Sequence, residues 1–237
     1  MDNAGYTSLT RQSGLLHEMR AIANNIANAN TTGFRAEGVA FSEYVVRLGP
    51  QTQSLSLATA RVRQTDFTQG DLGITNAPYD LAIEGEGFFM IDHPDGPMLT
   101  RSGAFTLSGE GVLVTADGYS LLDAGEAPVM IPADAGPVMI GSDGTIAVGG
   151  DAIGQIGLFT PTDPNTITRT SGTGFFSDDN MPVLDGVMRQ GHLENSNVNA
   201  ISQIARMIEV QRAYEFGQTL ADREDERIRN TIQLIKS

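Results

Sequence analysis

Three carboxylates in the middle of the chain are spaced closely enough to suggest acid/base chemistry. Glu84 and Glu86 are two residues apart, and Asp92 follows shortly after them. A pair of carboxylates can cleave a glycosidic bond by acting as acid and base. Glu84 and Glu86 would share one face of a strand, however, and they border glycines typical of turns. We therefore favour solvated turn carboxylates over a catalytic pair.

Three short loops could hold a ligand through backbone or carboxylate groups. Gly85-Glu86-Gly87 lacks the third glycine and the following helix that a phosphate-binding loop needs. Segments 142–145 and 178–180 carry aspartates that could bind calcium, but neither reproduces an EF-hand loop. Turn chemistry explains all three loops, so we predict neither a nucleotide nor a metal ion there.

The remaining reactive side chains are scattered along the sequence. His17, His93 and His192 lie far apart and have no carboxylate at ligand spacing, so no zinc site or catalytic triad is visible. The chain contains no cysteine, which excludes disulfides, thiolate nucleophiles and cysteine-bound metals. We expect a protein without enzymatic activity and without a cofactor.

The charge of the chain argues against two classes of partner. Its 237 residues carry a formal net charge of -14, and the sequence pI is about 4.4. This charge repels phosphate backbones and anionic lipids, so we expect no nucleic-acid partner and no membrane insertion. Residues 1–6 show no signal-peptide pattern, and no apolar run is long enough to span a bilayer. We expect a globular protein that is cytoplasmic or exported without a cleaved signal peptide.

Both ends of the chain show the three-to-four-residue spacing of amphipathic helices. Gly33 is expected to end the first helix, with Phe34 packing back on its last turn. The second follows the polar cluster 195–197, which could cap it, and about 40 helical residues would extend on the order of 60 Å. The apolar or small positions are Leu9, Ser13, Leu16, Met19, Ala23 and Ile26 in the first helix and Ile201, Ile204, Ile208, Ala213, Phe216 and Leu220 in the second.

Between the helices, short apolar runs alternate with Asp-Gly turns, a pattern typical of a mainly antiparallel β domain. The stretch 34–78 has no sustained period, and its most polar part is 51–54. We predict an α+β chain whose two long helices pack together on assembly. Its parts are an N-terminal helix (1–33), an extended connector (34–78), a central β-rich domain (79–194), and a C-terminal helix (195–237); the runs lie at 88–91, 112–114, 138–140 and 155–159 and the turns at 95–96, 117–118, 143–144 and 185–186.

Four asparagines near the end of the first helix need an explanation, because asparagine is a mediocre helix former. Asn24 and Asn28 share a face, Asn25 lies beside it, and Asn30 follows. Their amides could bond across to neighbouring helices, while the alanines between them allow close approach. The pattern favours an assembly surface over a frayed helix end.

Segment 22–35, IANNIANANTTGFR, resembles the N-terminal signature of the flagellar axial proteins, the family of rod, hook and hook-associated subunits. Residues 2–12 resemble the proximal-rod pattern more than the distal-rod one, and the chain has no room for the outer domains of hook proteins. The resemblance covers essentially the whole chain. Similar motifs lie at 70–72, 76–89, 100–105, 196–199 and 207–215.

This resemblance implies a non-enzymatic structural subunit of the flagellar basal-body rod, located in the periplasm and transmitting torque. It implies unfolded passage through the flagellar type III export apparatus and polymerisation with other rod subunits and with further copies of itself. The residues expected to carry assembly are Leu9, Leu16, Met19, Asn24, Asn25, Ile26, Asn28, Asn30, Gly33, Phe34, Ile201, Ile204, Ile208, Gln211, Arg212 and Tyr214.

Other interpretations stay open at the level of sequence. The two helices could pair within one monomer, and the chain could be a distal-rod-type subunit or a secreted β-domain binding module oligomerised by its helices. Gly217 departs from the family pattern and should weaken the second helix by about 1 kcal/mol relative to alanine. Removing residues 2–34 is expected to leave the β domain folded while abolishing assembly.

Overall fold

The computed structural model describes residues 2–46, 55–132, 136–163, 166–170, 172–177, 179–183 and 186–236. The predicted polar segment 51–54 and the turn residues Asp178 and Asp185 lie outside these ranges. The chain forms two compact units. The helical unit comprises Met1–Ala29, Ala36–Phe67 and Val198–Ser237, and the β unit comprises Asn30–Arg35 and Thr68–Asn197. The predicted α+β class is confirmed.

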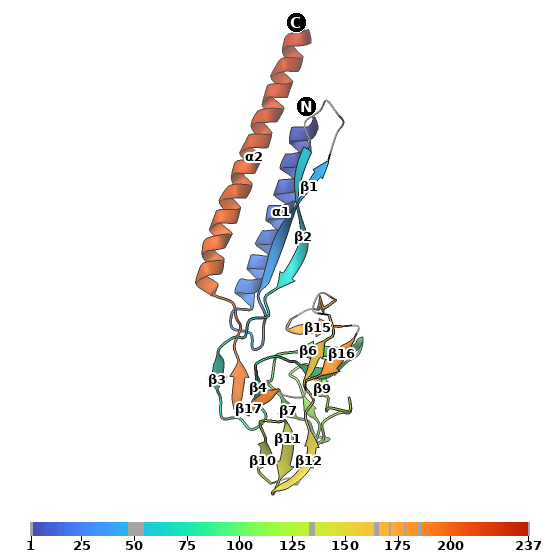
Figure 1. Cartoon of the computed structure of the whole chain (residues 1–237). Coiled ribbons are helices and arrows are strands. Elements are labelled where there is room, and N and C mark those ends of the chain that lie inside the picture. Colours follow the sequence, from blue (N-terminus) through green and yellow to red (C-terminus); the bar gives the residue numbers. More distant parts are fainter. Residues whose placement is uncertain are drawn as a thin grey trace. The chain divides into compact units, whose positions relative to one another are not determined.

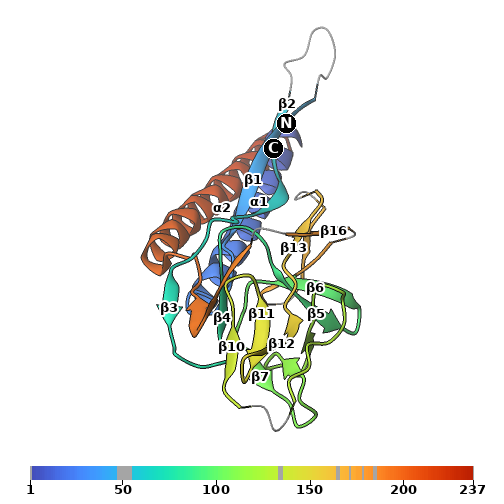
Figure 2. The same cartoon turned by 60° about the horizontal axis from the view of Figure 1, so that its bottom comes forward.

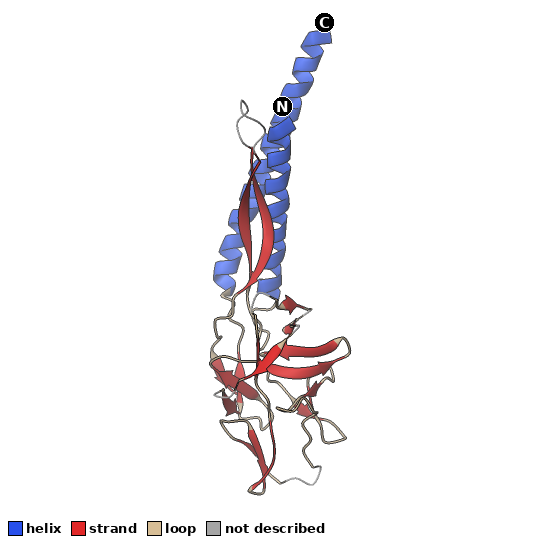
Figure 3. Ribbon diagram, turned by 45° about the vertical axis from the view of Figure 1, so that its right-hand side comes forward, coloured by secondary structure: helices blue, strands red, loops and turns tan. Residues whose placement is uncertain are grey.

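Two long helices dominate the helical unit. α1 (Asp2–Ala27) and α2 (Ala200–Lys236) lie side by side and antiparallel, and α2 extends past the first turn of α1 (Figures 1 and 3). The predicted weak point Gly217 does not interrupt α2. A Cβ at this position would lie 3.5 Å from the Gln12 side chain, so the glycine falls where the two helices approach each other closely.

Both inner helix ends differ from the predictions. α1 ends at Ala27, before the predicted stop at Gly33, and its last turn tightens as Asn28 donates its amide to two preceding carbonyls. α2 begins at Ala200, and its cap is Asn199 instead of the cluster 195–197: the Asn199 Oδ1 accepts the Ser202 amide at 3.0 Å. A side chain directly before the first turn reaches that amide, which explains the shift.

The stretch expected to be an extended connector contains a long antiparallel hairpin. β1 (Glu37–Val46) pairs with β2 (Leu55–Thr65) and lies along α1 (Figure 3). The register shifts between Ala40 and Phe41, and this irregularity breaks the alternation by which a strand is recognised in a sequence. A two-stranded hairpin is marginal in water by itself, so its packing on the helix is part of its stability.

The β unit is organised around a seven-stranded sheet with the order β14-β15-β6-β5-β9-β8-β7. Smaller ladders join β10-β11-β12, β13-β16, β17-β4 and β18-β3, and the described pairings are antiparallel as predicted (Figures 1 and 2). The strands are β3 (Leu72–Ile74), β4 (Leu81–Glu84), β5 (Phe89–His93), β6 (Gly96–Thr100), β7 (Thr106–Leu107), β8 (Leu113–Val114), β9 (Ser120–Leu121), β10 (Val138–Ile140), β11 (Thr145–Val148), β12 (Asp151–Gln155), β13 (Phe159–Pro161), β14 (Thr168–Arg169), β15 (Gly174–Phe176), β16 (Asn180–Pro182), β17 (Val187–Gln190) and β18 (His192–Glu194).

Apolar side chains from these strands form a closed core in the β unit. Leu81, Phe89, Leu113 and Leu121 are completely buried, and the rings of Phe89 and Phe105 meet edge to face at 5.4 Å. The Asp-Gly turns at 95–96, 117–118 and 143–144 are confirmed by the positive φ of their glycines. The β unit thus has a hydrophobic core of its own, and this core holds its strands and turns in place.

Candidate assembly surface of the terminal helices

Three of the residues predicted to carry assembly pack within the chain itself. Leu15 and Ile22 of α1 and Val210 of α2 are buried in the seam between the helices. Met19, Ile26 and Tyr214 are half-buried against this seam. The two helices therefore pair within one chain, which is the alternative left open by the sequence. Met19, Ile26 and Tyr214, which were predicted to carry assembly, contribute to this internal pair.

Other predicted residues lie on the outside of the helical pair. On α2, the exposed fractions of Ile201, Ile204 and Ile208 are 82%, 50% and 46%. At 3.6 residues per turn, this isoleucine face lies roughly 140° around the helix from the seam. On α1, Leu9 and Leu16 are exposed as well. Completely burying an exposed side chain of this kind is favourable by about 1.5–3 kcal/mol, and proportionally less for those already half covered, so a partner that covers these faces would gain free energy.

Polar groups border the isoleucine face on α2. Gln211 and Arg212 are exposed, and the Gln211 amide donates to Glu215 at 3.1 Å within the helix. Arg206 reaches across to Glu18 of α1 at 2.7 Å. The hydrogen bond to Glu18 raises the pKa of Arg206. The seam thus has an ionic border, while Arg212 points to no described partner.

The last turns of α2 combine apolar and charged side chains. Ile228, Ile232 and Leu234 are exposed in the described part of the helix. The preceding charged block satisfies itself along the helix, because Arg227 pairs with Glu224 and Arg229 with Asp225. The hydrogen bond from Arg227 lowers the pKa of Glu224. This end of α2 offers a second apolar area, beyond the charged block.

Asn25 joins three elements of the helical unit. Its side chain is buried; the amide Nδ2 donates to the Glu37 carbonyl at 2.7 Å, and its Oδ1 accepts the Glu37 amide at 2.8 Å. The same Nδ2 lies 3.3 Å from the Gln203 Oε1 on α2. A side-chain amide thereby pairs with the start of β1 as a neighbouring strand would. The amide of Asn25 reaches a neighbouring helix of the same chain, and a contact of this amide with another subunit stays a prediction.

The other predicted asparagines bond locally or face outward. The Asn28 Nδ2 donates to the backbone oxygen and to the side-chain oxygen of Asn24, at 2.8 Å and 3.0 Å. Asn30 is exposed and belongs to the β unit. Contacts of these three residues with other subunits stay a prediction.

Gly33 and Phe34 are anchors of the β unit, which is a different position from the helix end predicted for them. The Gly33 amide donates to the Glu194 carbonyl at 2.7 Å. Gly33 has φ +69°, and a Cβ there would lie 2.3 Å from the Ser102 nitrogen, so no other residue fits without displacement. Phe34 is buried, and the Arg169 guanidinium stacks between Phe34 and Phe175 with both ring centroids at 4.7 Å.

A buried carboxylate between two arginines ties this segment to the rest of the β unit. The Glu194 side chain is 1% exposed and pairs with Arg35 at 2.6 Å and with Arg101 at 3.2 Å. Its Oε1 also accepts the Gly70 amide at 3.1 Å. Arg35 additionally donates to the Thr68 carbonyl. Burial lowers the pKa of Arg101 to about 10, and the charge of Glu194 opposes that shift.

No local pattern in the sequence predicts this cluster. Arg101 and Arg35 lie inside motifs that carry the family resemblance, but nothing local marks either as buried. Buried arginines are rare without a partner, and the partner is distant in sequence. A hint of their burial is that each arginine lies next to residues that favour tight packing, in Phe34-Arg35 and in Arg101-Ser102-Gly103.

The residues considered for catalysis do not come together as a site. Glu84 pairs with Arg189 at 2.5 Å on the surface of the β unit, and Glu86 and Asp92 are exposed. The His93 ring packs against Tyr119, and the His192 Nδ1 lies 2.9 Å from the Gln190 carbonyl. Among the described residues, no group of three metal-ligating side chains is present.

The aspartate turns are explained by their own hydrogen bonds. Asp143 accepts the Thr145 amide at 3.0 Å and its hydroxyl at 2.8 Å, and these bonds lower the pKa of Asp143.

Neither of the two described helices is long and apolar enough to cross a membrane. The molecule does offer uncovered helix faces in the helical unit and a separate, well-packed β unit.

Three protein-family models match this chain. The flagella basal body rod protein model matches residues 6–35, the flagellar hook protein FlgE/F/G D1 domain matches 82–148, and the flagellar basal body rod FlgEFG protein C-terminal model matches 189–234. These ranges contain most of α1, the centre of the β unit and most of α2.

Whole-length relatives agree with the family models. Flagellar basal-body rod protein FlgF of Caulobacter vibrioides is 38% identical over 98% of each chain, and FlgF of Rhizobium meliloti is 38% identical over 91% of this chain and 90% of its own. Flagellar basal-body rod protein FlgG of Bacillus subtilis is 29% identical over 97% of each chain. Similarity to these FlgF proteins thus exceeds similarity to this FlgG protein. The chain belongs to the family of flagellar basal-body rod proteins.

Proposed function

We propose that this chain is a structural subunit of the bacterial flagellar rod, in its proximal part, and that it polymerises through the outer faces of α1 and α2. The isoleucine face of α2 carries this proposal. Ile201, Ile204 and Ile208 are exposed although the helix already has a buried seam elsewhere. An apolar face of this kind in a soluble chain favours association.

The arrangement also suits a polymer with many small contacts. An uncovered face on each of two helices lets one copy contact different neighbours with different surfaces, and such heterologous contacts build filaments instead of closed rings. Neighbours would be other rod subunits as well as copies of this chain. Torque would be carried by these packed side chains, and the subunit would catalyse no reaction.

We further propose that the chain reaches the periplasmic rod through the flagellar type III export apparatus and folds on arrival. Membership of the rod family supports this route. A chain without cysteine suits it as well, because no disulfide has to form on the way.

The test is complementation of a deletion strain, followed by electron microscopy of isolated basal bodies and a swimming assay. The triple variant Ile201→Ser, Ile204→Ser, Ile208→Ser should be exported yet fail to restore complete rods. The control is Ile74→Ser, which removes an isoleucine of similar average exposure from the β unit, and it should restore swimming. Normal rods with the triple variant would refute assembly through this face. Rods that stop at the distal part would instead assign the chain to the distal rod.

A further inference from the structure

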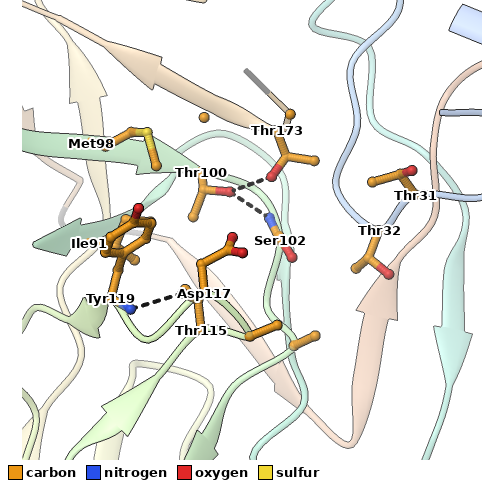
Figure 4. Close-up of a pocket in the computed structure, with 14 residues that line it drawn as sticks. Thr31, Thr32, Ile91, Met98, Thr100, Ser102, Thr115, Asp117, Tyr119 and Thr173 are labelled. Atoms are coloured by element: carbon orange, nitrogen blue, oxygen red, sulfur yellow. Dashed lines mark hydrogen bonds between the residues drawn. The ribbon is translucent and has the colours of Figure 1, made fainter. Parts of the chain in front are cut away.

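A pocket in the β unit with a mixed polar and apolar lining is separate from the helix faces described above. It encloses about 350 Å³, at the lower end of the ~300–1,000 Å³ typical of small-molecule sites. Four segments meet around it: residues 31–32, the strands β5 and β6 with the residues after them, the turn 115–119, and residues 172–174 (Figure 4). Ile91 and Met98, both buried, supply its apolar part.

Half of the lining residues carry a hydroxyl group, beside a larger apolar surface, and each hydroxyl can both donate and accept a hydrogen bond. Thr100 and Thr173 use theirs on each other at 3.3 Å, and the Thr100 hydroxyl also accepts the Ser102 amide at 3.1 Å. In the ranges that the structure describes, the side-chain hydroxyls of Ser102 and Tyr119 make no hydrogen bond to another residue. These groups are available to a ligand.

The charge of the lining restricts the class of ligand. Asp117 is the one charged side chain among the described lining residues, and it is exposed at the tip of its turn. The β unit as a whole carries four arginines against 18 carboxylates, a net charge of -14. Phosphates, nucleotides and carboxylates are therefore repelled. An apolar ligand would leave the hydroxyls unpaired, which costs free energy.

A polypeptide occupant fits the pocket less well. Strand addition needs a free sheet edge, but β5 is paired on both sides by β6 and β9, and β6 is paired by β5 and β15. Tyr119 is half-buried and its ring is held by His93 at a centroid distance of 4.7 Å. A fixed aromatic ring next to free hydroxyls and one carboxylate is suited to a molecule with hydroxyl groups on its rim and C–H groups on its face.

We propose that this pocket binds a neutral carbohydrate, a function that goes beyond assembly of the subunit. Asp117 would accept hydrogen bonds from adjacent hydroxyls of a sugar ring, Ser102 would exchange a further one, and Tyr119 would cover the C–H face of the ring. The site lies wholly within the β unit and does not depend on polymerisation.

The test is calorimetric titration of the full chain with the neutral trisaccharides maltotriose, cellotriose and chitotriose, and with the anionic trisaccharide of galacturonic acid. We expect a Kd of about 1 mM or tighter for at least one neutral sugar and no measurable binding of the anionic one. Asp117→Asn should weaken binding roughly tenfold, because it replaces a charged acceptor by a neutral one and hydrogen bonds to charged groups are the stronger ones. Glu110→Gln removes one exposed charge from the same unit outside the pocket, and it should leave the affinity unchanged.

Three outcomes would overturn the proposal. One is no binding of any neutral trisaccharide to a chain whose circular dichroism and thermal unfolding are normal. Another is sugar binding that Asp117→Asn does not weaken, which would place the sugar elsewhere. The third is a change in self-association of Asp117→Asn in sedimentation without any sugar binding, which would make the pocket a contact for another polypeptide. Ser102→Ala provides a second, mild variant for the same comparison.

Discussion

The two units of this chain differ in charge and in how completely they bury their apolar side chains. The β unit has a closed core and holds the entire net charge of -14, whereas the helical unit balances 11 cationic residues against 11 carboxylates. The helical unit buries only a thin seam and leaves isoleucines and leucines exposed. Neutral, apolar faces can approach copies of themselves, while strongly acidic units repel each other. In the proposed assembly, the helices would supply the contacts between subunits, and the acidic β units would keep apart from one another.

The largest expected effect separates the two units by truncation. A chain without residues 2–29 should keep a folded β unit but lose assembly, because α1 and its seam are gone. A chain without residues 2–35 should lose the β fold as well, because Phe34 and Arg35 are buried in it. Hydrogen exchange of the β-unit amides measures both. This revises the expectation that residues up to 34 are dispensable for folding, and equal protection in the two truncations would contradict the role of the anchor.

The next effect concerns the buried carboxylate. Glu194→Gln leaves the two buried guanidiniums of Arg35 and Arg101 without a counter-charge, and we expect a loss of about 3–5 kcal/mol in the free energy of unfolding of the β unit. Urea unfolding followed by hydrogen exchange measures it. Glu84→Gln is the control, because its pair with Arg189 is about half exposed and should contribute less than about 1 kcal/mol. Similar losses of unfolding free energy in both variants would mean that the buried ion pairs of Glu194 stabilise the β unit no more than the exposed pair of Glu84 does.

A smaller effect is expected at the turn that carries the anchor. Gly33→Ala forces a side chain into a left-handed backbone conformation and against the Ser102 nitrogen, and it should destabilise the β unit by about 1–3 kcal/mol. The thermal midpoint of the β unit reports the change. Gly109→Ala, where a Cβ would meet nothing within 4 Å, should have little effect. A stable Gly33→Ala variant would show that the turn can relax.

The last effect is of similar size but is confined to part of the helical unit. Asn25→Ala removes both hydrogen bonds to the Glu37 backbone and should cost about 1–3 kcal/mol, confined to the hairpin and its contact with α1. Local hydrogen exchange in β1 and β2 should rise while exchange in the β unit stays constant. Asn24→Ala, at an exposed position, serves as the control. Increased exchange throughout the chain would argue against two separable units.

Features that depend on near neighbours in the sequence were predictable. The two helices follow from apolar spacing, and the turns at 95–96, 117–118 and 143–144 follow from Asp-Gly pairs whose glycines have positive φ. The α+β class follows from both. Helix ends were predicted less well, since the cap of α2 depends on which of several asparagines reaches the first turn, and that residue is Asn199.

Features that depend on distant partners were not predictable. The β1–β2 hairpin was missed because its bulge at Ala40 and Phe41 breaks the alternation and because its stability comes from packing on α1. The burial of Arg35 and Glu194 was not predicted, because a charged residue is buried only together with its partner and these two partners lie far apart in the sequence. The faces of the helices were only partly predicted: Met19 and Tyr214 fit the apolar pattern but serve the internal seam.

The position of Glu194 near the end of the β unit also has a consequence for the order in which the molecule forms. Arg35 and Arg101 precede Glu194 in the chain. While the chain is made from its N-terminus, both arginines are therefore present before the carboxylate that neutralises them. In a chain that ends before Glu194, the guanidiniums of Arg35 and Arg101 would lack this carboxylate when they are buried. We therefore expect the β unit to close only once Glu194 is present to pair with these two arginines.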